Sequence, residues 1–309
     1  MCYLEMAGCV ATLRKEFRLR NFGFSGVKKE RFCMPIWQVP FVFYLIYRFV
    51  LMVYVIFWLG YTSHFHGSNL EIWGAYLTNW TYTLLTVYMI VHCLVVSYYY
   101  VCTFCGQDRY MYSFCRRMNV EYHTSIFAEQ SERMEHEHEC VVGEEPETEV
   151  LLVGTVSFVN RPPWYMCITW VLFSAVSTGA VMVTIVFFAF LFPVMKGASV
   201  MSLENVQLHL LNSVIILLEN FITGIPCRLL HVVYPILYGL LYLLFSLIYW
   251  AVDHSHVMYP ILDWNKPGPT VGFVFLIGFV FIPIIYTFFF LLYRLKMSVF
   301  HLLYRRANL

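Results

Sequence analysis

A hydroxyl and an imidazole near the starts of two apolar segments are the side chains of this sequence best suited to chemistry. Thr78 lies in Tyr-Leu-Thr-Asn-Trp, and His209 lies in Leu-His-Leu-Leu-Asn-Ser. If both segments are helices that start at the same membrane face, the two side chains lie at one depth. A threonine hydroxyl beside a basic histidine can attack an ester. A helix cap or a helix–helix hydrogen bond is the alternative role for such a threonine.

Two further pairs of ionisable residues fall inside apolar segments, where an unpartnered charge is costly. Arg48 and Glu219 are expected at similar depths, so we predict a buried ion pair between the first and fourth segments. The alternative is that Arg48 extends to the lipid headgroups. His92 and His231 could in principle ligate haem between helices, but an imidazole bonded to a carbonyl or a tyrosine is commoner. We therefore predict no cofactor.

The segments that position these residues must lie in lipid. Apolar residues make up 60% of the 309 residues, charged residues make up 13%, and the mean hydropathy is +0.65. These values lie outside the range of soluble domains. A net charge of +1 without a concentrated basic surface argues against nucleic acid as a partner. We predict a multi-pass protein of the plasma membrane or the endoplasmic reticulum, surrounded by membrane lipids.

Six segments are long enough to cross about 30 Å of hydrocarbon as helices. The segments are 41–61, 75–101, 164–192, 207–225, 230–251 and 271–293. The predicted fold is therefore an all-α membrane bundle of six transmembrane helices, which occupies residues 41–293.

Lysine and arginine predict the orientation of this bundle. Most of them fall in the N-terminal region 1–40, the loop 102–162 and the tail 294–309. The loops on the other side hold only Lys196 and Lys266. Because basic residues favour the cytosolic side, we expect both termini to be cytosolic. The second half of the loop 102–162 is dense in glutamate, which predicts a disordered linker.

The cysteines predict neither a disulfide framework nor a metal site. All ten fall on cytosolic or intramembrane positions in this topology, so none faces an oxidising compartment. Cys102, Cys105, Cys115 and His123 have side chains that bind zinc, but the second cysteine pair of a zinc site is missing.

Motifs in several spans resemble the rolling stone family. They are Tyr47-Arg48, Tyr76-Leu77-Thr78-Asn79-Trp80, Leu211-Asn212-Ser213-Val214, Pro226-Cys227-Arg228-Leu229-Leu230-His231, Tyr249-Trp250 and Tyr259-Pro260. The resemblance covers nearly the whole chain from the first span onward. It implies a multi-pass membrane protein, and the founding member of the family is associated with myoblast fusion. A non-catalytic role in adhesion or fusion, with a membrane-protein partner, is therefore one interpretation.

The rolling stone family is in turn distantly similar to the androgen-induced and androgen-dependent membrane hydrolases. These enzymes cleave fatty acid esters of hydroxy fatty acids with a threonine and a histidine. In these hydrolases the threonine follows an aromatic residue and a leucine at the start of the second span. Thr78 has the same position, so the resemblance implies that Thr78 is the nucleophile. In these hydrolases the histidine precedes a glutamate of the same helix by ten residues. His209 stands ten residues before Glu219, so the resemblance implies that His209 is the base. This chain departs from the hydrolases at Asn212 and Ser213, where they have a second histidine and threonines.

The second interpretation is therefore a threonine hydrolase of lipid esters that needs no metal or organic cofactor. We expect a polar cavity open toward the outer leaflet and lined by Thr78, Asn79, His209 and Asn212. A third group should orient the histidine, and the acidic candidates on the same face are Glu204, Asp253 and Asp263.

Overall fold

A computed structural model describes residues 16–65, 70–104, 161–193, 202–255 and 257–307 of the chain. The described residues are mainly helical and contain no strand, apart from an isolated bridge between Pro35 and Thr223. Almost all of the predicted acidic loop 102–162 lies outside the described residues.

Long α-helices alternate with short helical pieces along the chain. The α-helices are α2 (Glu30–Cys33), α3 (Phe41–Phe65), α4 (Leu70–Ala75), α5 (Leu77–Phe104), α7 (Trp164–Val186), α8 (Leu203–Asn205), α9 (Asn212–Ile222), α10 (Val233–Val252), α11 (Pro267–Leu276) and α12 (Ile282–Ala307). The 3-10 pieces are η1 (Leu19–Phe22), η6 (Leu229–Val232) and η7 (Pro260–Leu262). The π-helical pieces are η3 (Phe187–Leu191), η5 (Val206–Leu211) and η8 (Ile277–Phe281).

Six continuous helical stretches are long and apolar enough to cross a membrane. They are Phe41–His64, Leu77–Thr103, Trp164–Leu191, Leu203–Ile222, Leu229–Val252 and Pro267–Tyr304. The prediction of an all-α, six-helix multi-pass membrane protein is therefore confirmed. The sixth helix continues well past residue 293, where we expected the tail to begin. The side of the membrane that the termini face stays a prediction.

The outside of the bundle presents the surface that lipid requires. Large apolar side chains such as Phe49, Leu244 and Leu291 are exposed along α3, α10 and α12. In water such a continuous apolar surface would drive aggregation, whereas lipid tails solvate it.

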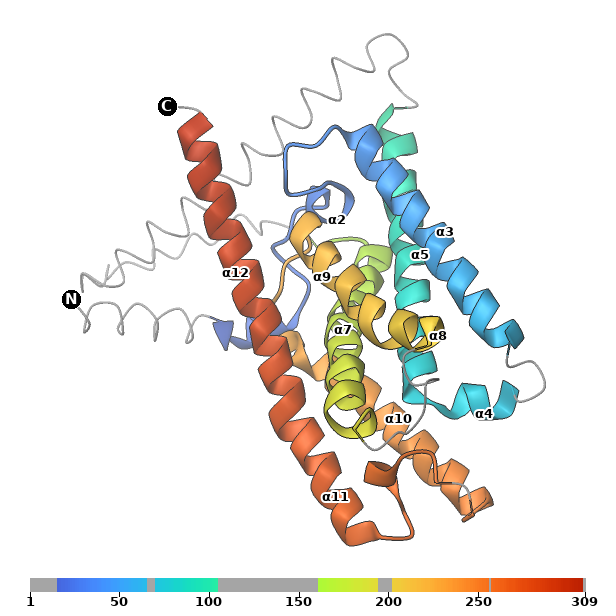
Figure 1. The fold of residues 1–309 in the computed structure, drawn as a ribbon. Helices are drawn as coiled ribbons and strands as arrows, with labels where there is room; N and C mark the ends of the chain where they lie inside the picture. The colour runs from blue at the N-terminus through green and yellow to red at the C-terminus, as the bar shows by residue number, and fades with distance from the viewer. Residues whose placement is uncertain (1–15, 66–69, 105–160, 194–201, 256, 308–309) are drawn as a thin grey trace, which may run out of the picture.

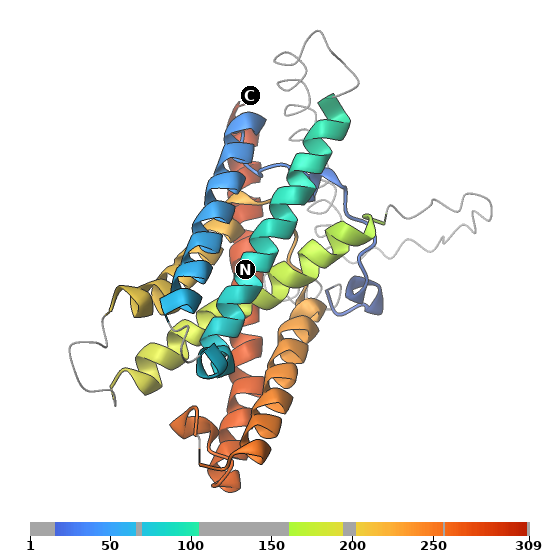
Figure 2. The ribbon, with the colours of Figure 1, turned by 90° about the vertical axis from the view of Figure 1, so that its right-hand side faces the viewer.

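Helix α7 occupies the centre of the bundle, with α5, α9, α10 and α12 packed around it (Figures 1 and 2). Trp170 on this helix is completely buried in the main apolar core. Gly179 lets neighbouring helices approach closely, because a Cβ there would lie 3.3 Å from Thr81 Cγ2. Small residues at such crossings are typical of helix packing in membranes.

The bundle has two ends, which both views separate clearly. The start of α3, the end of α5 and the end of α12 lie together at one end (Figures 1 and 2). Helix α4, the last turns of α10 and the start of α11 lie toward the other, which we call the α11 end. The candidate site is built from residues nearer the α11 end.

Part of the region that precedes the first span packs inside the protein. Phe32, Cys33 and Ile36 are fully buried, and the Ile36 N–H donates to the Ile222 carbonyl at 2.9 Å. Arg31 is buried as well, and its Nε donates to the Gly224 carbonyl at 3.0 Å. Residues 30–36 are therefore an integral part of the helical bundle.

Candidate active site

An apolar cavity of about 260 Å³ lies toward the α11 end, between the start of α5, the end of α7, α10, η7 and the α11–η8 stretch. Most of its walls are aliphatic and phenylalanine side chains. The hydroxyl- or nitrogen-bearing side chains that line it are Thr78, His209, Tyr242 and Tyr259. An apolar cavity with a few convergent polar groups is the usual form of a small-molecule site.

Thr78 is the second residue of α5, directly after the turn that joins α4 to α5. Two side chains hold this turn: Asn79 Nδ2 donates to the Trp73 carbonyl at 2.6 Å, and Trp80 Nε1 donates to the Gly74 carbonyl at 2.7 Å. Asn79 is therefore a brace of the turn and is not among the residues that line the cavity. The brace fixes the position of Thr78 at the cavity wall.

His209 belongs to the π-helical piece η5 and also lines the cavity. Its ring stacks on Phe187, with ring centroids 3.7 Å apart and planes 9° apart. The Thr184 hydroxyl donates to the His209 carbonyl and also bonds to the Ser213 hydroxyl. The ring atom Nδ1 is buried and has no hydrogen-bond partner among the described residues. A buried imidazole nitrogen without a partner is costly, which favours a role in binding or catalysis.

Two tyrosines hold η5 between α3 and α5. Tyr54 donates to Gln207 Oε1 at 2.6 Å, and Gln207 Nε2 donates to the Tyr82 hydroxyl at 3.0 Å. Gln207 is fully buried and lies two residues before His209. Its two bonds satisfy both ends of the amide and fix the segment that carries the histidine.

All three π-helical pieces that the structure describes contribute to the cavity wall. Phe187 and Leu191 come from η3, and His209 comes from η5. Residues 277–279 come from η8. π-Helical turns are rare and are enriched at functional sites. Their convergence on one cavity is a feature that hydropathy could not reveal.

The cavity therefore brings Thr78 and His209 to one site, although no hydrogen bond joins them among the described residues. Asn212 is fully buried but does not line the cavity; its Nδ2 is 3.5 Å from the Leu208 carbonyl. The acidic residues expected to orient His209 do not line the cavity either. Asp253 accepts hydrogen bonds from Ser255, and Asp263 lies 3.8 Å from Lys266.

Sequence reasoning missed the two tyrosines of the site. The Tyr259 hydroxyl accepts the Leu77 N–H at 3.0 Å. Burial raises the pKa of Tyr259 to about 12, and its contacts with Leu77 and Thr78 oppose that rise. Tyr242 donates to the Ala75 carbonyl at 2.9 Å. The Tyr259-Pro260 motif was the available signal, but only the structure shows which helix it approaches.

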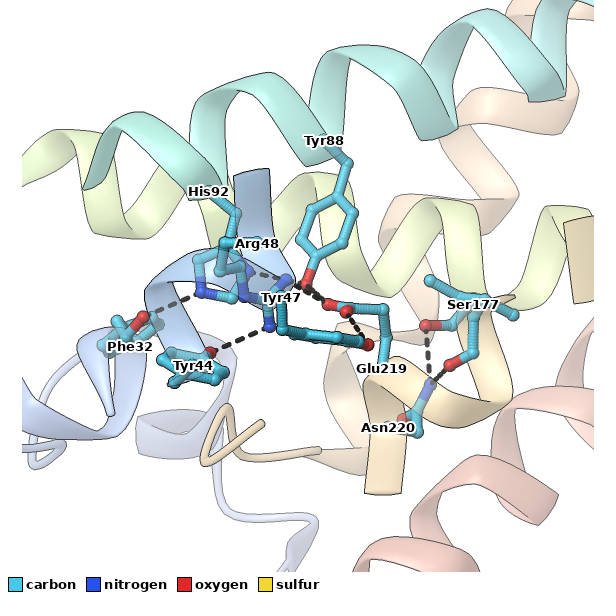
Figure 3. Close-up of polar contacts among 10 residues, drawn as sticks. Phe32, Tyr44, Tyr47, Arg48, Tyr88, His92, Ser177, Glu219 and Asn220 are labelled. Atoms are coloured by element: carbon cyan, nitrogen blue, oxygen red, sulfur yellow. Dashed lines mark hydrogen bonds and ion pairs between the residues drawn. The ribbon is translucent and has the colours of Figure 1, made fainter. Parts of the chain in front are cut away.

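A second polar cluster joins α3, α5 and α9 in the bundle interior (Figure 3). Arg48 Nη1 lies 2.5 Å from Glu219 Oε2, and both side chains are buried. Tyr88 donates to the same carboxylate oxygen at 2.9 Å, and Tyr47 donates to Oε1 at 2.7 Å. Arg48 Nη2 donates to the Tyr44 hydroxyl at 2.8 Å. Both oxygens of the Glu219 carboxylate therefore have partners.

His92 extends this cluster and does not meet His231. Its Nδ1 lies 2.8 Å from the Tyr88 hydroxyl, and its Nε2 donates to the Phe32 carbonyl at 2.8 Å (Figure 3). Both ring nitrogens are thus engaged, which leaves none to ligate haem. His231 packs against Trp170 with ring centroids 4.7 Å apart. The described residues contain no group of three metal-ligating side chains, and Cys105, Cys115 and His123 lie outside the described ranges.

The end of α9 is held by its own contacts. Asn220 Nδ2 donates to the Ser177 hydroxyl of α7 at 3.2 Å, as Figure 3 shows. Lys296 of α12 donates to the carbonyls of Asn220 and Thr223 at 2.6 and 2.7 Å. A cation at the carbonyl end of a helix is favourable, so Lys296 joins α12 to α9.

Comparisons with known proteins agree with this architecture. A family model described as "Protein rolling stone" matches residues 156–306, which include His209 and Tyr259. The chain is 25% identical over 298 residues to Protein rolling stone of Drosophila melanogaster, covering 92% of this chain and 90% of that relative. No solved structure matches the chain significantly.

Proposed function

We propose that this chain, which belongs to the rolling stone family, is a hydrolase of membrane-lipid esters with Thr78 as its nucleophile and His209 as its base. One observation carries the proposal: both residues line a single apolar cavity within the membrane-spanning part of the protein. Their helices lie far apart in the sequence, so the shared cavity is a property of the fold.

The proposed reaction has two steps. The Thr78 oxygen attacks the ester carbonyl, and His209 takes the hydroxyl proton. The bond between the carbonyl carbon and the alcohol oxygen breaks, and His209 returns the proton to the leaving alcohol. Water then attacks the acyl-threonine, gives a proton to His209, and releases a carboxylic acid as the Thr78 hydroxyl forms again. Phe187 holds the imidazole ring in one plane through both steps.

The cavity favours a substrate that lies like a lipid in one leaflet. Thr78 is the second residue of the span Leu77–Thr103, so it lies near a membrane surface. Leu240 and Phe279 also line the cavity, but they are 53% and 74% exposed on the lipid-facing side. Leu240 lies in the middle of its span, so the cavity opens toward lipid at about the depth of the acyl chains. An ester near the surface with its acyl chain toward the bilayer centre fits this arrangement.

The cavity also favours a neutral scissile group. Among the residues that line it, none is a lysine, an arginine or a carboxylate. A charged headgroup would therefore remain outside the cavity, at the membrane surface. If both termini are cytosolic, as the basic residues predict, the site draws its substrate from the leaflet away from the cytosol.

Labelling by a fluorophosphonate probe tests the proposal. Thr78→Val removes the hydroxyl and keeps the shape of the side chain. Thr83→Val is its matched control, because Thr83 lies in the same helix, bonds among the described residues only to the Asn79 carbonyl, and does not line the cavity. We expect wild type and Thr83→Val to be labelled equally, and Thr78→Val and His209→Gln to lose labelling by about 100-fold or more.

Each other outcome has a definite meaning. Labelling of Thr78→Val at the wild-type rate would exclude Thr78 as the nucleophile. A folded wild type that is not labelled and hydrolyses no lipid ester would leave the chain as a non-catalytic rolling stone protein. A non-catalytic protein that acts in adhesion or fusion should tolerate loss of Thr78 and His209 and depend on its loops.

A further inference from the structure

We infer that Tyr88 and His92 form a binding site for one proton beside the Glu219 carboxylate. The bound proton converts His92 to an imidazolium and strengthens its bond to Phe32, in the buried segment 30–36. None of these side chains lines the cavity, so the proton site is separate from the proposed hydrolase site. The hydrogen bonds drawn in Figure 3 contain one proton more than an ion pair with a neutral histidine can supply.

One hydrogen bond of His92 has a single possible direction. Its Nε2 lies 2.8 Å from the Phe32 carbonyl oxygen, which can only accept. Nε2 therefore carries a proton, whatever the charge of the ring. A neutral imidazole has one such proton, so a neutral His92 leaves Nδ1 bare. In that state Nδ1 can bond to the Tyr88 hydroxyl, 2.8 Å away, only by accepting the phenolic proton.

Tyr88 has one proton and two partners. Its oxygen lies 2.8 Å from His92 Nδ1 and 2.9 Å from Glu219 Oε2. An ionised carboxylate only accepts, so the phenolic proton is the one that makes the bond to Glu219. When it does so, a neutral His92 turns a bare nitrogen toward the phenol oxygen. When the phenol donates to His92 instead, two oxygen lone pairs face each other. Both bonds form together only when one more proton is present.

The additional proton belongs on His92. Glu219 is the poorer base, because a guanidinium and two tyrosine hydroxyls donate to its carboxylate and stabilise the anion. A proton on Nδ1 makes His92 an imidazolium, which donates to Tyr88 and to Phe32. The three bonds from Glu219 to Phe32 are then all satisfied at once.

Other ionisable groups surround this site. They are Tyr44, Tyr47 and Arg48 of α3, Cys93 of α5, Cys33 of α2, and Lys296 of α12, which bonds to the carbonyl of Asn220. The Glu219 carboxylate already neutralises Arg48, so a proton on His92 gives the cluster a net positive charge, which is costly inside a membrane. The empty site has a different cost, which is one unmade buried hydrogen bond. These opposing costs make the proton exchangeable.

The proton should act on the buried segment 30–36. A hydrogen bond from a charged donor is roughly twice as strong as one from a neutral donor. The imidazolium form of His92 therefore holds the Phe32 carbonyl more tightly than the neutral ring does. The bond from the Ile36 N–H to the Ile222 carbonyl does not involve the site. Acid should therefore tighten the segment at Phe32 and leave its other end unchanged.

Nitrogen NMR of the whole protein in lipid nanodiscs, with ¹⁵N-labelled histidine, measures the proton directly. At about pH 8 we expect His92 to have a protonated Nε2 and a bare Nδ1, and toward about pH 5 both nitrogens should be protonated. The Phe32 carbonyl signal should shift over the same pH range, and the Ile222 carbonyl signal should not. A ring that stays neutral in the folded protein down to about pH 4 would overturn the inference.

Two tyrosine variants separate the proton site from the ion pair. Tyr47→Phe and Tyr88→Phe each remove one hydroxyl that donates to Glu219, but only Tyr88 also contacts His92. At the pH where the wild-type ring is half protonated, Tyr88→Phe should lower the imidazolium fraction about fivefold, and Tyr47→Phe should change it less than about twofold. Equal fractions in the two variants would show that Tyr88 has no part in the site. The wild-type titration decides the inference even if Tyr88→Phe does not fold.

Discussion

Two buried polar regions in this bundle use their hydrogen-bonding groups in opposite ways. In the cluster around Glu219, both carboxylate oxygens have donors, and charges of opposite sign lie in contact. At the cavity of about 260 Å³, His209 is a lining residue whose buried Nδ1 has no hydrogen-bond partner among the described residues. The polar groups of the cluster bond to one another, whereas the imidazole at the cavity keeps a nitrogen that bonds to no described residue.

The difference separates stability from function. A nearly satisfied buried network links helices and loses much when one member is removed. A cavity with unpartnered polar atoms lowers stability and persists where function requires it. Substitutions in the cluster should therefore reduce folded protein, and substitutions in the cavity should reduce activity in a protein that still folds.

The largest effect is expected at Glu219. Glu219→Ala leaves Arg48 buried without its counter-charge, so the free energy of unfolding should fall by about 3–5 kcal/mol. Denaturant titration of the purified protein in detergent measures this loss. The double variant Arg48→Met with Glu219→Leu should lose less than Glu219→Ala alone, because no unpaired charge remains. Additive losses from the two single changes would show that the residues do not act as a pair.

The opposite sign is expected at His209. His209→Leu removes the unpartnered nitrogen and adds apolar surface to an apolar cavity, so the free energy of unfolding should rise by about 1–2 kcal/mol. The same variant should lose probe labelling. A loss of stability at this position would mean that His209 supports the fold as the Glu219 cluster does, and it would remove the contrast between the two regions.

Filling the cavity should change chain-length selectivity. A Cβ at Gly278 would meet no atom within 4 Å, so Gly278→Leu should place its side chain in the cavity without displacing the helix. We expect hydrolysis of a long-chain ester to slow about tenfold, which corresponds to about 1.4 kcal/mol, while a short-chain ester is cleaved at nearly the wild-type rate. Equal slowing of both esters would indicate that the acyl chain lies elsewhere.

The smallest effect is expected at Thr184. Its hydroxyl bonds to the His209 carbonyl and to Ser213, so Thr184→Val should lower the free energy of unfolding by about 1 kcal/mol and slow labelling moderately. Thr184→Ser keeps the hydroxyl and should restore both quantities. If serine restores stability without restoring labelling, the hydroxyl stabilises the helix contact and has no part in positioning His209.

The sequence predicted the six spans because lipid demands long apolar helices, and hydropathy records that demand directly. Matching depths also suggested a common site for Thr78 and His209 and the contact of Arg48 with Glu219. Depth along a helix says nothing about which neighbour a side chain faces. For that reason Asn79 was expected in the cavity, although it braces the α4–α5 turn. Tyr259 was missed because a loop carries it.

The buried segment 30–36 has a consequence for biosynthesis. Arg31 bonds to Gly224 and Tyr293, which follow it by 193 and 262 residues. At a translation rate of about 5–20 residues per second, the nearer partner emerges roughly 10–40 s later. The segment leaves the ribosome before both of its partners and can dock only after they have emerged. Its docking therefore marks the completion of the bundle, and a chain that is cut short before Gly224 leaves this segment exposed to the quality-control machinery.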